Sequence, residues 1–453
     1  MSLWRSFSQF ILKKRSVLAL LIIALTAFMG YQGTQIRLSY ELAKILPTGD
    51  PHFQRYEAFK ARYGEDGNVM VVGIQTPDMY TLSLFRSWYE LAKEIKQIEG
   101  IKEVLSNASL YELVRNDSLS TFEFVPLLKT TPTEQAEVDT LAAKIAKLPF
   151  YEGFVSSEDG TAHLMAITFD QDKLNSKSRI TMAHEIRDKV KVFGLEHKVD
   201  VRLSGMPYIR TEFMSKVSKE MGLFMGLAFG VTAIILLLFF RSVVVALASV
   251  FVVGLGVVWS LGLIHSFGYK ITLLSGLIPP LLIVIGVPNT IFLVNKYHEE
   301  FGQHGDKLRA LGTSVEKSSE TTFWANITTA IGFGVFYFTG SPLLTEFGLI
   351  AALCVLITFV ISMVMVPFIF GLLPTPSARQ RGHLDAPRVN AFLETIAKVV
   401  NRRRTVLYTV VGVIVAVSIV GMTRITAVGF VVDDLPKNDP IYADLKFFEQ
   451  NFK

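Results

Sequence analysis

The sequence is poor in charge and almost without cysteine. Of its 453 residues, 19% are charged and one is a cysteine, whereas about 25% of residues are charged in ordinary soluble domains. Between Gly222 and Phe240, and between Ile271 and Val294, there is no charged residue. Each run is long enough to cross a bilayer as a helix. A disordered chain and a single soluble domain are therefore excluded. With Cys354 alone no intrachain disulfide can form, so any domain outside the cytoplasm depends on its own core.

Motifs for several kinds of chemistry are also absent. The sequence has no Walker-type phosphate loop, so ATP-driven transport would need a separate ATPase. His-x-x-x-His, Cys-x-x-Cys and Gly-x-Ser-x-Gly are missing, and neither a zinc hydrolase nor a serine esterase is indicated. We therefore expect no enzyme, no cofactor and no metal site. The net charge of +5 comes from basic residues that flank apolar runs, so no nucleic-acid partner is expected.

Apolar runs predict seven membrane-spanning helices. Their expected positions are 17–35, 221–240, 243–266, 272–294, 323–340, 346–372 and 405–423. The loops on the amino-terminal side are rich in Lys and Arg, as at Arg241 and Arg402–Arg404. The short loops 267–271 and 341–345 on the other side hold only Lys270. Because cytoplasmic loops carry the excess of positive charge, this predicts a multi-pass protein of the inner (plasma) membrane with a cytoplasmic amino terminus.

One large polar segment, residues 36–219, is expected outside the cytoplasm and has the pattern of an α/β domain. The predicted strands are 68–75, 101–106, 152–156, 161–169 and 198–204, and the predicted helices are 81–98 and 176–194. The order β-α-β, β-α-β with a hairpin in the middle is that of a ferredoxin-like domain. Residues 107–150 do not fit this order and are interpreted as an insertion with a helix over 133–148.

The chain contains an internal repeat with an offset of 389 residues. Leu46–Pro51 and Leu435–Pro440 share the pattern Leu-Pro-x-x-Asp-Pro. The same offset aligns the starts of the first and last predicted spans, and in each copy an amphipathic helix precedes the span. Residues 390–453 therefore repeat residues 1–64, and the rest of a second copy is expected beyond them. Duplicated halves related about the membrane normal are a known transporter design.

These patterns define the expected domains. They are a cytoplasmic amphipathic helix (1–16), the first span (17–35), an exoplasmic (periplasmic) α/β domain (36–219), a five-helix bundle (220–373) with a cytoplasmic helix at 296–322, a cytoplasmic linker and amphipathic helix (374–404), the seventh span (405–423) and the start of a second exoplasmic domain (424–453). His298, Glu299 and Glu300 are interpreted as a solvated stretch of helix beyond the membrane.

Motifs in the clustered spans resemble the resistance-nodulation-division (RND) superfamily. Gly286–Glu300 is similar to its fourth span, Gly-x-Asp followed by Phe-Leu and Arg-Tyr-x-Glu-Glu. Asn326–Gly334 with Glu346-Phe347-Gly348 resembles its fifth and sixth spans, and Ser204–Pro207 resembles the Thr-Gly-x-Pro before its second. The likeness is greatest to the mycobacterial-membrane-protein-large (MMPL), Patched and hopanoid-exporter branches. It implies a sterol-sensing-type helix bundle, an exoplasmic porter domain and export of lipids or other hydrophobic compounds.

The sequence departs from this pattern where the family carries its proton-carrying aspartate. Pro288 occupies that position and Asn289 the next. Neither can titrate, although a carboxylate inside a membrane usually serves ion coupling. Pro288 also predicts, with Pro279 and Pro280, a kinked or locally broken fourth helix. The candidate coupling residues are Gly286, Pro288, Asn289, Thr290, Asn326, Thr328, Thr329 and Glu346. Two interpretations stay open, a polar clamp between helices and a remnant coupling or gating site.

Two functions from different classes fit these observations. The first is a transporter that exports lipids or other hydrophobic compounds from the inner membrane, driven by protons through the second half of the same full-length chain. The alternative is a non-pumping lipid-binding sensor or scaffold, which the missing aspartate favours. Membrane lipids or a hydrophobic substrate are the expected ligands, and a homo-oligomer is left open. No motif encodes which substrate is moved.

Overall fold

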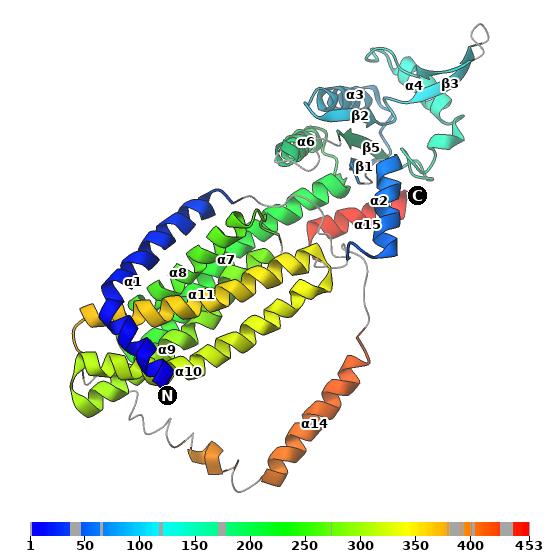
Figure 1. The fold of residues 1–453 in the computed structure, drawn as a ribbon. Helices are drawn as coiled ribbons and strands as arrows, with labels where there is room; N and C mark the ends of the chain where they lie inside the picture. The colour runs from blue at the N-terminus through cyan, green and yellow to red at the C-terminus, as the bar shows by residue number, and fades with distance from the viewer. Residues whose placement is uncertain are drawn as a thin grey trace. The chain divides into compact units, whose positions relative to one another are not determined.

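The structure is a computed structural model of the chain (Figure 1). It describes residues 2–36, 47–63, 67–116, 121–170, 178–272, 274–377, 380, 391, 394–398, 400, 404–425 and 438–452. The chain divides into two compact units. We call Met1–Gln54 with Val217–Thr426 the helix bundle, and Arg55–Lys216 with Ala427–Lys453 the α/β unit. Most of the predicted linker and amphipathic helix, 374–404, and much of 424–453 lie outside the described residues.

Long helices with apolar middles make up the helix bundle. They are α1 (Ser2–Thr34), α7 (Met206–Phe240), α8 (Val243–Ser266), α9 (Ile278–His304), α10 (Lys307–Gly334), α11 (Pro342–Leu372) and α14 (Arg404–Met422). Among the described residues, six helices are long and apolar enough to cross a membrane, and α10 is not one of them. Because a helix satisfies its backbone hydrogen bonds internally, it can lie in hydrocarbon without cost to its peptide groups. The chain is therefore a polytopic helical membrane protein.

The predicted fifth span, 323–340, lies in α10 but does not form a separate apolar helix. α10 begins at Lys307, ends at Gly334 and is followed by a 3₁₀-helix, η3 (Val335–Thr339). Much of α10 is polar, and several of its hydroxyl residues are buried: Ser314, Ser318, Ser319 and Thr322. The helix nevertheless packs against α9 and α11. A hydropathy pattern therefore does not predict that a helix as polar as α10 packs inside this bundle.

The predicted cytoplasmic helix at 296–322 is wrong, because two helices share this segment. α9 ends at His304, and Gly305 takes a left-handed φ of 69°. Asp306 then begins α10 by accepting hydrogen bonds from the amides of Leu308 and Arg309 at 2.9 and 3.2 Å. A left-handed glycine closes one helix, and an aspartate cap opens the next. Residues 296–322 are therefore the end of α9, a tight turn at Gly305 and Asp306, and the first part of α10.

Two other expected boundaries fall inside continuous helices. The predicted amphipathic helix 1–16 and first span 17–35 together form α1, which is unbroken from Ser2 to Thr34. α7 likewise runs unbroken from Met206 to Phe240, through the boundary expected between 219 and 220. Proline is absent from α1, and in α7 it occurs only at position 207, in the first turn, where it does not interrupt a helix.

α1, which holds the first span, packs against other helices of the bundle, whereas its repeat counterpart α14 has no buried residue. α1 packs along α8, where a Cβ atom on Gly262 would lie 2.5 Å from the carbonyl oxygen of Met29. Only glycine allows helices to approach so closely. Trp259 Nε1 also donates a hydrogen bond to Thr26 Oγ1 at 2.8 Å. By contrast, none of the nineteen residues of α14, all of them described, is buried.

A four-stranded antiparallel sheet is the centre of the α/β unit. Its strands are β1 (Val69–Gln75), β2 (Ile101–Leu105), β5 (Ala162–Phe169) and β6 (Val201–Ser204), in the order β2-β5-β1-β6. Helix α3 (Leu82–Lys96) connects β1 to β2, and α6 (Ser178–His197) connects β5 to β6. Apolar residues recur along α3 at helical spacing, and Phe85, Trp88 and Ile95 are fully buried in the core of the unit. The predicted positions of these two helices are confirmed.

The insertion between β2 and β5 holds an element that the sequence pattern missed. The predicted helix there forms as α4 (Gln135–Ile145). In addition, β3 (Tyr111–Asn116) and β4 (Thr121–Pro126) pair as an antiparallel hairpin. The predicted strand at 152–156 is wrong, since a 3₁₀-helix, η1 (Pro149–Tyr151), leads into a loop held by isolated bridges. Gly153 in that loop has a φ of 74°, which interrupts an extended strand.

The internal repeat is visible in two short helices. α2 (Pro51–Tyr63) and α15 (Pro440–Asn451) both begin at a proline that follows an aspartate, and 440 − 51 = 389 is the repeat offset. In each helix the aspartate accepts a hydrogen bond from the amide two residues on, Asp50 from His52 at 2.7 Å and Asp439 from Ile441 at 3.1 Å. An aspartate cap followed by proline is a strong helix start, so the repeat preserves local structure.

Burial distinguishes these two helices. None of the thirteen residues of α2, all of them described, is buried. α15 instead packs on β6 and buries Ile441 and Phe448. The carboxylate of Asp444 accepts from Arg202 Nη1 and from the Leu203 amide, each at 3.2 Å. α15, which belongs to the second repeat copy, is thus part of the first copy's α/β unit.

The contact between α15 and the sheet predicts the effect of enlarging Gly73. A Cβ atom at Gly73 of β1 would lie 2.7 Å from the Phe447 ring and 2.8 Å from the Phe448 ring. Gly73→Ala should therefore displace α15 and destabilise the unit by about 1–3 kcal/mol. Amide hydrogen exchange should speed up in β6 and α15. Gly222→Ala is the control, since nothing lies within 4 Å of its new Cβ; unchanged exchange in both variants would contradict the packing.

His163 is a buried titratable group in the same unit. Its side chain lies on β5, where Nδ1 is 2.8 Å from Asn107 Nδ2 and 3.3 Å from Ser156 Oγ. Burial lowers its pKa to about 4, although a hydrogen bond with the Thr76 backbone and the charge of Asp159 act in the opposite direction. The folded unit therefore holds a neutral imidazole where the unfolded chain, with a pKa near 6.5, is protonated.

This difference predicts a loss of stability in mild acid. As the pH falls from about 6.5 to about 4, the unfolded state binds a proton that the folded state does not, which lowers the free energy of unfolding by about 3 kcal/mol. His163→Gln should flatten the pH dependence of the unfolding midpoint in this window. His52→Gln, at an exposed position, should leave it as in the wild type. An equally steep curve for His163→Gln would contradict the assignment.

Candidate functional site

The predicted coupling residues centre on α9, which continues through Pro288. The helix begins with Pro279 and Pro280 near its first turn and runs unbroken from Ile278 to His304. Of the two expected forms, a kinked or a locally broken helix, the broken one is therefore not observed. Pro288 provides no amide hydrogen, so the carbonyl one turn earlier loses its usual helical partner. The surrounding helices have to accommodate this polar position.

Asn289 is paired with a second amide from the neighbouring helix. Its Nδ2 donates to Asn326 Oδ1 at 3.3 Å, and Asn326 Nδ2 donates back to Asn289 Oδ1 at 2.9 Å. Asn326 Nδ2 also reaches the Thr322 carbonyl of its own helix at 2.7 Å. Both side chains are buried. The expected approach of α9 and α10 at these residues is present, and the two amides satisfy each other across the helix pair.

Gly286 and Thr290 lie one helical turn apart on the same helix. A Cβ atom on Gly286 would lie 3.0 Å from Thr358 Cγ2 of α11, so this glycine allows α9 and α11 to pack closely. Thr290 is buried, and its hydroxyl donates to the Gly286 carbonyl at 3.4 Å. The buried hydroxyls of Thr358 and Ser362 have no hydrogen-bond partner within the described residues. This part of the bundle therefore has unused hydrogen-bonding capacity.

Three of the predicted residues do not join this group. Thr328 is exposed and Thr329 is half-buried on α10, and their hydroxyls donate to the carbonyl of Ala325 at 2.9 and 2.8 Å. Glu346 is half-buried near the start of α11. Two residues later, Gly348 packs on Phe333 and Phe336, at least seven residues beyond Asn326. Seven helical residues span about 10 Å, so Glu346 is remote from the amide pair.

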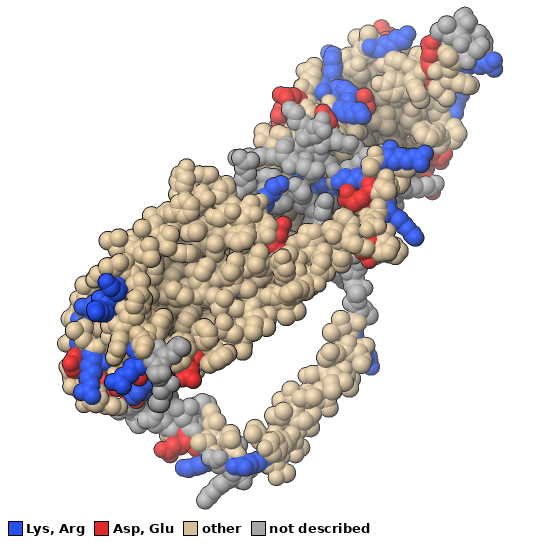
Figure 2. All heavy atoms as spheres, in the orientation of Figure 1, with Lys and Arg blue, Asp and Glu red and all other residues tan. Residues whose placement is uncertain are grey.

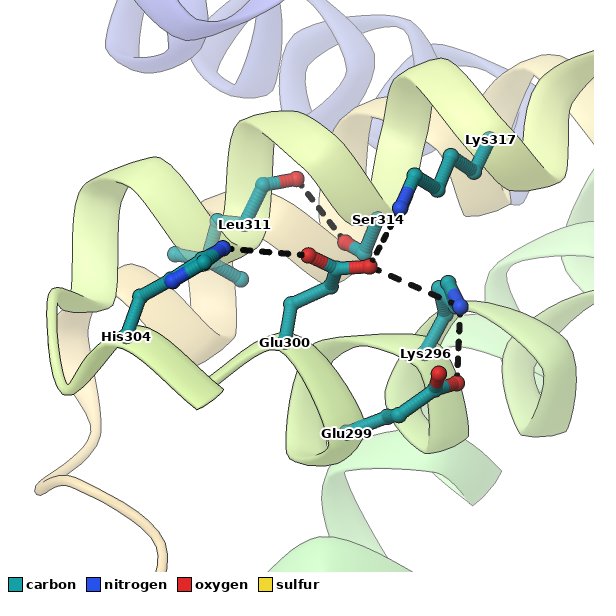
Figure 3. A network of polar contacts seen from close by, with 7 residues as sticks. All are labelled: Lys296, Glu299, Glu300, His304, Leu311, Ser314 and Lys317. Atoms are coloured by element: carbon teal, nitrogen blue, oxygen red, sulfur yellow. Dashed lines mark hydrogen bonds and ion pairs between the residues drawn. The ribbon is translucent and has the colours of Figure 1, made fainter. Parts of the chain in front are cut away.

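A second polar cluster lies where α9 and α10 meet at their turn (Figure 3). Glu300 extends from α9 toward α10, and its side chain is 2% exposed. Lys317 Nζ lies 2.8 Å from one carboxylate oxygen and Lys296 Nζ lies 3.5 Å from the same atom. His304 Nε2 is 3.9 Å from the other oxygen. Lys296 also pairs with Glu299 at 2.7 Å. The carboxylate is thus surrounded by basic groups, which offsets the cost of burying it.

This cluster corrects the sequence interpretation of residues 298–300. His298 and Glu300 are both buried, with 1% of each residue exposed, rather than solvated. Lys296 and Glu300 are four residues apart on a helix and so share a face, but this spacing does not distinguish a buried pair from a solvated one. Lys307 adds a further link, because its Nζ donates to the carbonyl of Gly371 at 2.8 Å near the end of α11. A cation suits the carbonyl end of a helix.

Charge is distributed unevenly over the helix bundle. Figure 2 shows a long uncharged surface along the bundle, with Lys, Arg, Asp and Glu gathered at its ends. The Glu300 cluster and Lys307 lie at the end that also carries the turn between α9 and α10. Within the described residues no group of three or more His, Cys, Asp or Glu could hold a metal ion. The bundle centre therefore offers neutral amides and hydroxyls, and its charges lie at its ends.

A bundle of long apolar helices, with an α/β unit between its first and second members, defines a polytopic membrane protein of the RND type. Residues 57–403 match the sequence model of the MMPL family. The chain belongs to the MMPL family, which is part of the RND superfamily. It is also similar to a membrane protein of Methanocaldococcus jannaschii, with 20% identity over 379 residues that cover 78% of this chain and 90% of the relative.

The Glu300 cluster predicts unequal effects of two neighbouring substitutions. Glu300→Gln keeps the shape of the side chain but removes the charge that Lys317 and Lys296 contact. We expect it to lower the free energy of unfolding by about 1–2 kcal/mol. Glu299→Gln changes a 41% exposed side chain and should cost less than about 0.5 kcal/mol. Thermal unfolding in detergent measures both, and equal effects would show that burial at Glu300 has no energetic consequence.

Proposed function

We propose that this chain is a non-enzymatic RND-type transporter that exports lipids or other hydrophobic compounds from the inner membrane. The observation that carries the proposal is the α/β unit inserted between α1 and α7, in a chain of the MMPL family. Its strand order β2-β5-β1-β6, with α3 and α6 as the connections, supports a ferredoxin-like porter domain. Such a domain would receive a hydrophobic substrate that leaves the bilayer.

We place the amino terminus in the cytoplasm and the α/β unit on the exoplasmic (periplasmic) side. The Lys and Arg residues near the turn between α9 and α10, including Lys307 and Lys317, support this orientation through the positive-inside rule. The loop between α8 and α9 carries Lys270 as its single Lys or Arg.

We further propose that energy coupling lies outside the Asn289–Asn326 pair. Two amides that satisfy each other carry no charge and cannot take up a proton. They act as a polar clamp between α9 and α10. The second copy of the repeat is then the place for proton coupling, and α15, packed in the first α/β unit, supports a working connection between the copies. Membrane lipid, or a hydrophobic substrate, is the expected ligand.

The same amide pair favours a second candidate function. A bundle whose central polar residues are locked together, with no carboxylate at the Pro288 position, also suits a non-pumping lipid-binding sensor or scaffold. This candidate shares the fold and the lipid ligand with the transporter. It differs in that bound lipid stays with the protein, so a transfer measurement separates the two functions.

The test is transfer of a fluorescent phospholipid from vesicles that contain the chain to acceptor vesicles. The transporter predicts release above that of empty vesicles, whereas lipid that co-purifies with the protein without any release supports the sensor or scaffold. Asn289→Leu alone should destabilise the bundle by about 1 kcal/mol, because it strands the Asn326 amide. The double variant Asn289→Leu with Asn326→Leu should recover stability and keep wild-type transfer. A stable double variant without transfer would assign the pair to coupling.

A further inference from the structure

The α/β unit contains a cavity, lined in part by His163, that is separate from the polar sites of the helix bundle. It has a volume of about 320 Å³ and lies between α4, the loop 148–160 and β5. Its apolar wall includes Ile145, Leu148 and Pro149. Its other walls carry Tyr80, Tyr151, Ser156 and His163, with Glu152 and Glu158 also in the lining. A small cavity with one apolar wall and a few polar groups has the usual make-up of a ligand site.

The side chains of this cavity are held in place before any ligand arrives. The Tyr151 hydroxyl donates to the Tyr111 carbonyl at 2.7 Å. The Tyr80 ring stacks on Phe85 and meets the His163 ring edge-on, with centroids 5.8 Å apart. Fixed rings lose little conformational entropy when they contact a ligand. The cavity is therefore preorganised on its aromatic side.

Backbone hydrogen bonds fix the loop that carries the acidic residues. The Gly153 amide donates to the Ser156 carbonyl at 2.8 Å, and the Val155 amide donates to the Tyr151 carbonyl at 3.1 Å. Val155 is fully buried and anchors the loop on the unit, so Glu152 and Glu158 stand on a rigid frame. Both glutamates are exposed.

The charge of the lining selects one sign of ligand. Among the described residues that line the cavity there are two glutamates and no lysine or arginine. The one titratable base, His163, is neutral at physiological pH because burial lowers its pKa to about 4. The lining thus presents carboxylates and tyrosine rings, and both favour a cation.

We propose that this cavity binds an organic cation, a protonated or quaternary amine that carries a short apolar group. Tyrosine rings attract an ammonium through their faces, Glu152 supplies the opposite charge, and the wall formed by Ile145, Leu148 and Pro149 covers the apolar group. This proposal concerns binding alone and does not depend on lipid transport.

The experiment is titration calorimetry of the full chain in nanodiscs with butyltrimethylammonium and, as the neutral probe, 2,2-dimethylhexan-1-ol, in which a quaternary carbon replaces the nitrogen and one methyl carries a hydroxyl for solubility. The cation should bind at least about tenfold more tightly than the neutral probe. Glu152→Gln and Tyr151→Leu should each weaken cation binding by about threefold to tenfold. Glu112→Gln, on the exposed strand β3, is the matched charge control and should bind as the wild type does.

Two outcomes would overturn the proposal. One is equal affinity for the charged and the neutral probe, which would make the cavity a purely apolar pocket. The other is wild-type affinity in both Glu152→Gln and Tyr151→Leu, which would place the cation elsewhere. Glu152 is exposed, so its substitution leaves the core intact, and unchanged thermal unfolding of each variant verifies folding. A loss of affinity confined to the two cavity variants supports the assignment.

Discussion

One constraint shapes the helix bundle: a polar side chain surrounded by hydrocarbon must find its hydrogen-bond partner inside the protein. The reciprocal amides of Asn289 and Asn326 meet this constraint between α9 and α10. Near the turn that joins the same helices, Glu300 meets it with Lys296 and Lys317. Both polar clusters connect α9 to α10. The position of one helix along the other is therefore fixed at two places, the amide pair and the Glu300 cluster. Because α10 cannot be lipid-exposed on its polar face, its packing against α9 and α11 follows from the same requirement.

The repeat adds a second constraint, which acts on the α/β unit. α2 and α15 start with the same aspartate-proline cap, yet only α15 has buried residues. The difference lies in the side chains at matching positions. Asp444, which receives Arg202 and the Leu203 amide, corresponds to Arg55 in α2, and Ile441 corresponds to His52. Both copies have the aspartate-proline start of the helix. Only α15 also has the side chains that pack on this sheet.

The sequence predicts the elements that have a regular apolar spacing or a clear helix cap. It located α3, α6 and the apolar cores of the long helices, because each has a sustained apolar face. It also identified the contact between Asn289 and Asn326. It missed the β3–β4 hairpin, whose strands are short and largely exposed, and it divided α1 and α7 at changes of composition that do not interrupt a helix. Glu300 was read as solvated because burial of a carboxylate depends on Lys317, seventeen residues away on another helix. Tertiary partners of this kind have no signature in a local pattern.

The residues at the bundle centre limit where proton coupling can take place. Pro288 and Asn289 give α9 no titratable group at this level, and the neighbouring polar residues on α10 and α11 are amides and hydroxyls. Neutral groups avoid the several kcal/mol that an isolated charge costs in hydrocarbon. They also cannot take up a proton. A proton-driven cycle in this family member would therefore need a titratable group outside the centre of this bundle.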